Sequence, residues 1–279
     1  MANRNSPLSV RGLCKAYPSF HLKDVSFDLV PGEITGFIGR NGAGKTTTLN
    51  AILSFVRKDA GEVSFWGLDG GKNAREIKEK IGFVSAGMTY YTTKKLKTIT
   101  TVTRSFYPGW QEDAYQAYMR RFGLEEEKTP AALSNGMKIK YALALALSHG
   151  AELLILDEPT SGLDPVSREE LIEIFLSLRD AGKTILFSTH ITSDLEKCAD
   201  RVLFLRRGEL AADLPLTEFA DAYRILDCVL PPQHALGACR ARTGYTALLS
   251  RQDAAGLDGA RVPTLDEIMV HLDREEGAK

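Results

Sequence analysis

The feature that constrains the fold most is a glycine-rich segment, residues 39–46, with the sequence GRNGAGKT. It matches the spacing G-x-x-x-x-G-K-[S/T] at every fixed position, and the apolar run Ile34–Ile38 directly precedes it. Apolar residues then recur at helical spacing, at Leu49, Ile52, Leu53 and Val56. Glycines allow backbone N–H groups to converge on phosphate oxygens, and a helix N-terminus adds positive potential. A strand, a glycine loop and a helix in this order therefore predict a cradle for the phosphates of a nucleotide.

Two side chains of this segment have predicted chemical roles. Lys45 is expected to reach the β- and γ-phosphates of ATP as a catalytic cation, and the Thr46 hydroxyl is expected to ligate Mg²⁺. ATP and Mg²⁺ are thus the predicted ligands. The candidate nucleotide-binding residues of the loop are Gly39, Asn41, Gly42, Ala43, Gly44, Lys45, Thr46 and Thr47.

A pair of acids marks a second candidate region. The apolar run at residues 153–156 ends in Asp157 and Glu158. Open α/β sheets bind ligands at the carboxyl ends of their strands, so Asp157 is predicted to hold Mg²⁺ through water and Glu158 to polarise the attacking water. Alone, such a pair could simply cap the next helix. The phosphate loop earlier in the chain favours the catalytic interpretation.

The remaining pattern predicts an α/β fold. Short apolar runs without polar alternation indicate strands covered on both faces, at residues 34–38, 81–85, 153–156, 184–188 and 202–205. Together with the loop they predict a P-loop NTPase with a RecA-like parallel sheet core. Residues 139–147 alternate as a strand would, but alanine at three intervening positions favours a helix. This helix belongs to a helical insert subdomain expected at about residues 87–150.

Two units are expected along the chain. Residues 1–213 form the predicted core with its insert, and residues 214–279 form a small C-terminal extension. The last helix is marked by a capping box, Thr264 with Glu267, ahead of an apolar stripe at Leu265, Ile268, Met269 and Leu272. Ser167 with Glu170 is predicted to form another capping box within the core. The apolar stripe of the last helix must pack on another surface.

Net charge and the lengths of the apolar runs argue against a nucleic-acid-binding protein and against a membrane-spanning one. The formal net charge is -1, so no global field draws the chain to nucleic acid, and no nucleic-acid partner is expected. No apolar run approaches the roughly 18 residues that a membrane helix needs. Any role at a membrane is therefore expected to come through a partner protein.

The order of the motifs resembles the nucleotide-binding subunit of ABC (ATP-binding cassette) transporters. The resemblance covers about residues 8–210. Residues 133–137, LSNGM, are similar to the LSGGQ signature, and residues 161–164, SGLD, are similar to the D-loop. His190 resembles the switch histidine of the family, and Tyr17 stands where an aromatic residue stacks on adenine, although Phe20 is close by.

This resemblance implies an ATP sandwich. Two cassettes, as a homodimer or with a paralogue, would dimerise head to tail on ATP, and Ser134, the Gly136 backbone and Asp164 would complete the site of the opposite subunit. His190 and Glu158 would be catalytic. The subunit would hydrolyse ATP to power a separate transmembrane permease, as in bacterial exporter-type single cassettes, and would lie in the cytoplasm on the inner face of the cell membrane.

One family motif is missing. The glutamine expected after residues 81–85 is replaced by Ala86, and the next glutamine is Gln111. Alanine can neither ligate Mg²⁺ nor orient water, so slow basal hydrolysis is expected. The alternatives are a cassette ATPase that acts on ribosomes or nucleic acid, and a regulatory nucleotide sensor, which the Ala86 substitution would suit.

Overall fold

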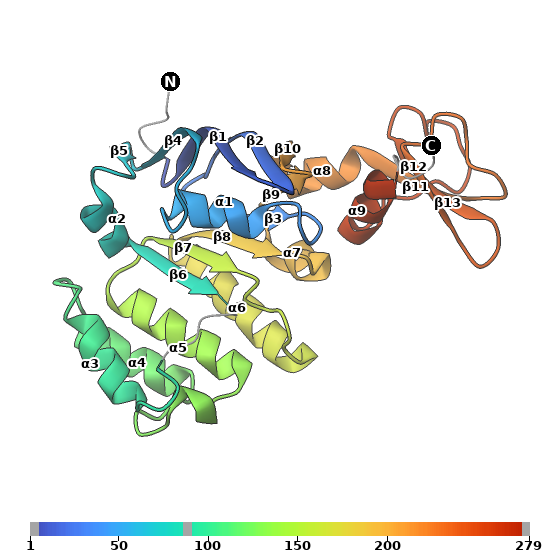
Figure 1. The fold of residues 1–279 in the computed structure, drawn as a ribbon. Coiled ribbons are helices and arrows are strands. Elements are labelled where there is room, and N and C mark those ends of the chain that lie inside the picture. Colours follow the sequence, from blue (N-terminus) through green and yellow to red (C-terminus); the bar gives the residue numbers. More distant parts are fainter. Residues whose placement is uncertain (1–5, 86–90, 275–279) are drawn as a thin grey trace.

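The structure is a computed structural model that describes residues 6–85 and 91–274. Its centre is a six-stranded sheet in the order β10-β9-β3-β8-β7-β6 (Figure 1). Five strands are parallel, and β10 pairs antiparallel with β9. The bounds are β3 Ile34–Ile38, β6 Ile81–Ser85, β7 Leu153–Asp157, β8 Thr184–Thr189, β9 Arg201–Arg206 and β10 Glu209–Pro215. The α/β fold with a parallel core and the five predicted strands are confirmed.

A second sheet covers one side of this core. It is antiparallel, with the order β2-β1-β4-β5, and comprises β1 Ser9–Tyr17, β2 Phe20–Asp28, β4 Ala60–Phe65 and β5 Leu68–Asp69. Helix α1, Lys45–Ile52, contributes buried Leu49 and Ile52 to the apolar core shared by the two sheets. The predicted helical position of Val56 is wrong, because α1 ends at Ile52 with Leu53 as its C-cap, and Ser54 then takes a left-handed φ of 60°.

Helices lie against the other side of the parallel sheet. They include α5 Asn135–Ser148, α6 Pro165–Asp180 and α7 Thr192–Cys198, with α3 Leu96–Arg104 and α4 Glu112–Arg121 packed beyond α5. The helix predicted at residues 139–147 is confirmed. It is buried at every position from Tyr141 to Ser148, and this explains why its sequence shows no amphipathic period. The short helix α2, Ala74–Lys80, leads into β6.

The N-terminus of α6 differs from the prediction. Asp164, not Ser167, is the N-cap, because its Oδ1 accepts the backbone N–H groups of Val166 and Ser167, both at 3.0 Å. Pro165 occupies the first helical position, where its missing N–H costs nothing. The capping box predicted from Ser167 and Glu170 is therefore wrong, because Ser167 already lies inside the first turn.

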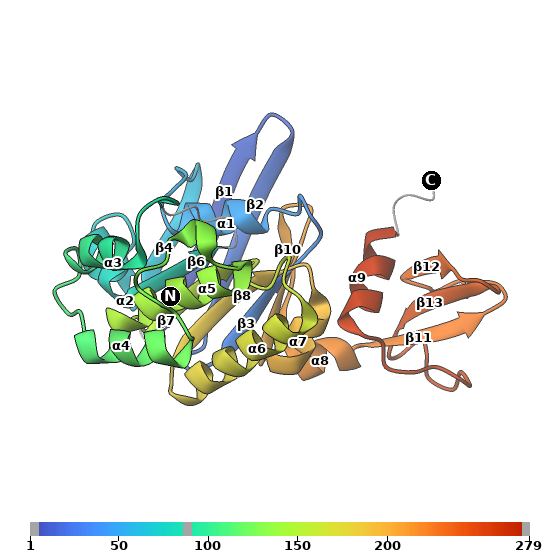
Figure 2. The same ribbon diagram turned by 90° about the horizontal axis from the view of Figure 1, so that it is seen from below.

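The chain ends in a small α/β layer beside the core. After α8, Leu216–Asp221, a three-stranded sheet has the order β11-β13-β12, with β11 Tyr223–Cys228, β12 Gly237–Arg240 and β13 Tyr245–Ser250. Helix α9, Leu265–Arg274, lies between this sheet and α7 (Figures 1 and 2). The capping box of α9 is present: the Thr264 N–H donates to Glu267 at 2.9 Å, and the Glu267 N–H donates to the Thr264 hydroxyl at 3.2 Å.

Candidate nucleotide-binding site

The phosphate loop joins β3 to α1, and two of its glycines are required by geometry. Gly39 has φ 154°, and a Cβ there would lie 2.3 Å from the Leu205 carbonyl oxygen. Gly44 has φ 109°, and a Cβ there would lie 2.5 Å from the Phe20 ring. Both backbone angles are rarely open to other residues. The loop therefore packs too closely against β9 and β2 for a larger residue at either position.

Lys45 is held beneath the loop. Its side chain is only 6% exposed, and its Nζ donates to the Gly39 carbonyl oxygen at 2.7 Å. The Glu158 carboxylate lies 3.5 Å from the same ammonium. Burial lowers the pKa of Lys45, and the attraction of Glu158 opposes that shift. The result is a cation placed at the loop beside the acids Glu158 and Asp157.

Oxygen atoms cluster at the ends of β7 and β8. The Thr46 Oγ1 lies 3.3 Å from Asp157 Oδ2, and the Ser188 hydroxyl donates to Asp157 Oδ1 at 2.6 Å. Asp157 and Ser188 are paired in the parallel register of the two strands. Sequence reasoning missed Ser188, because the order of the strands within the sheet was not predicted.

These oxygens suit a hard divalent cation. Mg²⁺ prefers oxygen ligands and keeps several waters, so Thr46 and Asp157 fit it as a partial set. No cluster of three histidine, cysteine or acidic side chains that could hold a metal occurs in the described ranges. Phosphate oxygens and water would therefore complete the coordination.

Glu158 is fixed in an unusual conformation. Its φ of 51° is left-handed, and its N–H donates to the Ser188 carbonyl oxygen at 3.0 Å. Its carboxylate oxygen lies 2.7 Å from His190 Nδ1. A left-handed angle in a non-glycine residue costs about 1–3 kcal/mol and persists only where the surroundings determine it. Here the strand end and the two contacts keep the carboxylate aimed at the cavity.

A cavity of about 650 Å³ joins most of the predicted site. The predicted residues that line it are Tyr17, Asn41, Gly42, Gly44, Lys45, Thr46, Thr47, Glu158 and His190. Gly39, Ala43 and Asp157 are not among the lining residues and support the loop or the oxygen cluster from behind. Sequence reasoning missed Arg40 and Ser161, which also line the cavity, together with Pro18 and Ser19 of the turn between β1 and β2. Phe20, the alternative aromatic candidate, lines the cavity as well.

The signature residues Ser134 and Gly136 do not line this cavity, and of the D-loop Ser161 lines it but Asp164 does not. Exposed Ser134 caps α5 by accepting the Met137 N–H at 3.2 Å, and Gly136 is buried in the first turn near Ser167. Asp164 caps α6, and hydrogen bonds from the Ser167 hydroxyl and backbone lower its pKa. The chain on its own therefore brings the loop, the acids and His190 together but leaves Ser134, Gly136 and Asp164 elsewhere. Ala86, predicted to replace a glutamine, lies outside the described residues.

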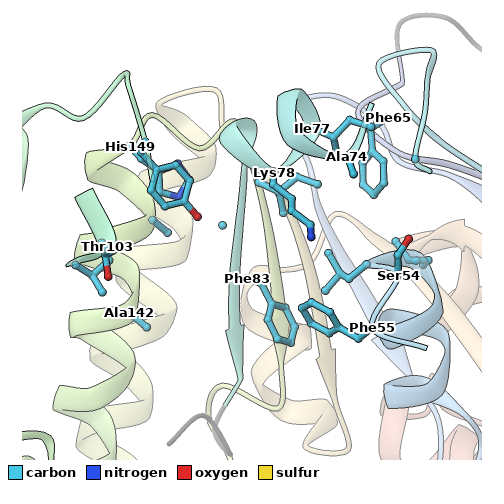
Figure 3. A pocket seen from close by; sticks show the side chains of 18 residues that line it. Ser54, Phe55, Phe65, Ala74, Ile77, Lys78, Phe83, Thr103, Ala142 and His149 are labelled. Atoms are coloured by element: carbon cyan, nitrogen blue, oxygen red, sulfur yellow. The ribbon is translucent and has the colours of Figure 1, made fainter. Parts of the chain in front are cut away.

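A second cavity lies between the core and the helices α3 and α5 (Figure 3). It has a volume of about 280 Å³ and a largely apolar lining that includes Phe55, Phe83, Thr103 and Ala142. The Phe55 and Phe83 rings meet edge to face at 5.5 Å, and Phe55 is still 58% exposed. At the rim, His149 stacks on Tyr107 at 3.9 Å.

The fold and the first cavity define a P-loop ATPase of the parallel α/β class. Residues 22–161 match the model of a protein family described as ABC transporter. Bacitracin transport ATP-binding protein BcrA of Bacillus licheniformis is 34% identical over 73% of this chain and 68% of its own length. Nod factor export ATP-binding protein I of Burkholderia orbicola is 34% identical over 75% of this chain and 70% of its own length.

Solved structures agree with this match. CbiO1 from Clostridium perfringens, part of the ABC transporter complex CbiONQ, has a TM-score of 0.66 and 25% identity, and the alignment covers 77% of this chain and 90% of that one. The chain therefore belongs to the ABC transporter family, as an ATP-binding subunit with ATPase activity. Such subunits work with membrane permease components. Within the described residues, no helix is both long and apolar enough to cross a membrane. The predicted family, fold class and ATPase function are confirmed.

Proposed function

We propose that Lys45 binds the β- and γ-phosphates of ATP in the 650 Å³ cavity and that Glu158 is the general base of hydrolysis. The observation that carries this proposal is the convergence of Lys45, Glu158 and His190 from three separate segments on one cavity. A carboxylate held between an ammonium and an imidazole can accept a proton from an attacking water. The ammonium stabilises charge on the transferred phosphoryl group.

His190 orients the base. Its Nδ1 contact with Glu158 fixes one carboxylate oxygen and leaves the other near Lys45. Phosphates that enter the cavity compete with Glu158 for the lysine, so nucleotide binding would free the carboxylate for proton transfer. Of the two aromatic candidates for adenine stacking, Tyr17 is favoured, because it is 38% exposed whereas the Phe20 ring packs against Gly44.

Thr46 and Asp157 would hold Mg²⁺ with the phosphates. When bound, Mg²⁺ neutralises phosphate charge that would otherwise repel a nucleophile. The Ser188 hydroxyl keeps Asp157 aligned for this role by its hydrogen bond of 2.6 Å. Asn41, Gly42, Ala43, Gly44 and Thr47, with Gly39, would supply the loop backbone around the phosphates.

A second cassette would complete the site. Ser134 is exposed at the N-terminus of a 14-residue helix, which favours an anion, yet it does not line the cavity of its own chain. In a head-to-tail dimer the signature of one copy would meet the ATP of the other, with Gly136 and Asp164 at the same interface. The partner cassette would be a second copy of the chain or a paralogue.

Trapping the ATP-bound dimer tests both proposals. Glu158→Gln keeps the shape of the side chain but loses the base, so the variant should bind ATP, hydrolyse it at most slowly and elute as a dimer in size-exclusion chromatography. The Lys45→Ala, Glu158→Gln double variant is the matched control and should stay monomeric with ATP. Normal turnover by Glu158→Gln would refute the base assignment, and an ATP-independent elution volume would refute the sandwich.

The second cavity would receive a transmembrane permease subunit. Its apolar lining and exposed Phe55 suit an apolar segment of a partner, and Val102 and Phe106 add exposed apolar surface on and just after α3. The cassette would then lie at the inner face of the cell membrane through this contact. Because relatives are named for bacitracin transport and Nod factor export, an exporter-type partner is proposed.

Co-purification tests this contact. Phe55→Asp should abolish recovery of a multi-span membrane protein with the tagged chain and leave ATP binding intact. Val229→Asp, at a residue 84% exposed in the loop after β11, is the matched control and should keep the partner. Equal recovery with both variants would place the permease contact elsewhere.

A further inference from the structure

The C-terminal helix α9 reaches the phosphate loop. Asp273, near its end, is only 9% exposed, and its Oδ2 lies 3.5 Å from the Nε of Arg40. Its Oδ1 lies 3.6 Å from the Nε of Arg206, at the end of β9. Arg40 follows Gly39 in the loop and lines the nucleotide cavity. A single carboxylate with little exposure thus joins helix α9 to the phosphate loop.

The opposite end of α9 is anchored on α7, the helix that follows His190. The Leu265 N–H, at the first residue of α9, donates to the Glu196 carboxylate on α7 at 2.6 Å. Helix α7 begins two residues after His190. Leu265 and Ile268 are buried in the same apolar cluster as Leu195 of α7. Helix α9 is therefore docked on α7 at its start and contacts the phosphate loop through Asp273 near its end, and this docking sets where Asp273 lies.

Arg40 is the group through which this contact can act. Its side chain is 69% exposed, so apart from Asp273 little packing restrains the guanidinium. It carries a permanent positive charge and up to five N–H donors, and phosphate oxygens are its natural partners. A carboxylate and a triphosphate would compete for it.

We propose that Asp273 is a positioning residue that holds Arg40 away from the nucleotide phosphates, so that docking of α9 lowers the affinity of the phosphate loop for ATP. The C-terminal extension then tunes nucleotide occupancy: any event that shifts α9 releases Arg40 and strengthens binding. This inference rests on the proposed use of the cavity for ATP.

The test measures binding of ATP, and KM and kcat for its hydrolysis, in the full chain. Asp273→Asn should lower Kd and KM for ATP about two- to fivefold, the range expected when an ion pair with one exposed partner is released, with kcat within about twofold. Asp266→Asn removes the same charge from the exposed first turn of α9 and should leave both constants unchanged. Thermal melting of each variant shows that the fold is retained.

A double-mutant cycle isolates the role of Arg40. In an Arg40→Gln background, Asp273→Asn should change Kd by less than about 1.5-fold, because its partner is gone. The inference is overturned if Asp273→Asn increases ATP affinity as much in the Arg40→Gln background as in the original chain. It is also overturned if Asp273→Asn alone weakens ATP binding. Lys45→Ala distinguishes a missing effect of α9 from a wrongly assigned nucleotide site. If Lys45→Ala abolishes binding and Asp273→Asn changes nothing, only the α9 contact is refuted, whereas normal binding by Lys45→Ala refutes the site itself.

Discussion

Replacement of Ile268 by alanine measures how firmly the C-terminal helix is docked. Ile268 is 0% exposed on α9 and belongs to the apolar cluster that includes Leu195 of α7 and Leu248 of β13. Truncation of a buried isoleucine to alanine costs about 2–5 kcal/mol, because the lost transfer free energy adds to that of the cavity left behind. Alanine also favours helix slightly more than isoleucine does, so the expected net cost is about 3 kcal/mol.

This cost translates into a clear shift of the melting temperature. For a chain of this size, about 2–4 °C is lost per kcal/mol, so Ile268→Ala should lower Tm by about 6–12 °C. Val270→Ala is the matched control, because Val270 is 40% exposed on the same helix and should shift Tm by less than about 2 °C. Circular dichroism at 222 nm, recorded for both variants, compares the two directly.

Equal melting curves would refute the reasoning. If Ile268→Ala melts within about 2 °C of Val270→Ala, α9 is not packed in solution as described. If an early transition appears in Ile268→Ala alone while the main one stays in place, α9 is docked but unfolds as a separate unit from the core. Hydrogen exchange of the α9 amides distinguishes these outcomes, because a locally opened helix loses protection without loss of protection in the parallel sheet.

Four further outcomes are expected. Lys45→Ala should abolish ATP hydrolysis and weaken ATP binding at least tenfold by calorimetry while melting normally, since it removes the phosphate-binding cation. Burial lowers the pKa of His149, so below about pH 6.5 the unfolded chain takes up a proton that the folded state resists. The free energy of unfolding should therefore decrease as the pH is lowered below about 6.5. His149→Gln should make this decrease smaller, as measured by thermal melts at a series of pH values. Hydrogen bonds from Arg261 and Thr264 lower the pKa of Glu267 to about 2, so Glu267→Gln should cost about 0.5–2 kcal/mol of unfolding free energy at pH 7 and progressively less below about pH 4.5. Ala86→Gln should raise basal hydrolysis with little change in ATP affinity, and unchanged turnover would mean that another residue already orients the water.

The strands of the parallel core could be predicted from the sequence because they are buried on both faces. Strands covered on both faces contain almost only apolar residues, and such runs stand out, as Ile34–Ile38 does. The strands of the antiparallel sheet are partly exposed and mix charged with apolar residues. Ser9–Tyr17 includes Arg11 and Lys15, and its register shifts break the alternation that would mark a strand. That sheet and the small C-terminal sheet were therefore not predicted.

The candidate site also has residues that the sequence predicted and contacts that it did not predict. Lys45, Asp157 and Glu158 were predicted because local spacing specifies a phosphate loop and a strand-end acid pair. The contacts of Ser188 with Asp157 and of Asp273 with Arg40 depend on which strands are neighbours and on where the last helix docks. Such contacts between distant segments leave no periodic trace in one sequence, so only the fold could reveal them.

The pairing of Asp157 with Ser188 has a consequence for how the chain tolerates insertions and deletions. The alignment of these two residues is set by backbone hydrogen bonds along the whole of β7 and β8, not by the side chains alone. Successive residues of a strand point to opposite faces, so one extra residue inside β8 would turn Ser188 away from the acid while every residue of the site kept its identity. Length changes within these strands should thus be as damaging as loss of the acid itself. Surface loops far from both strands should accept such changes freely.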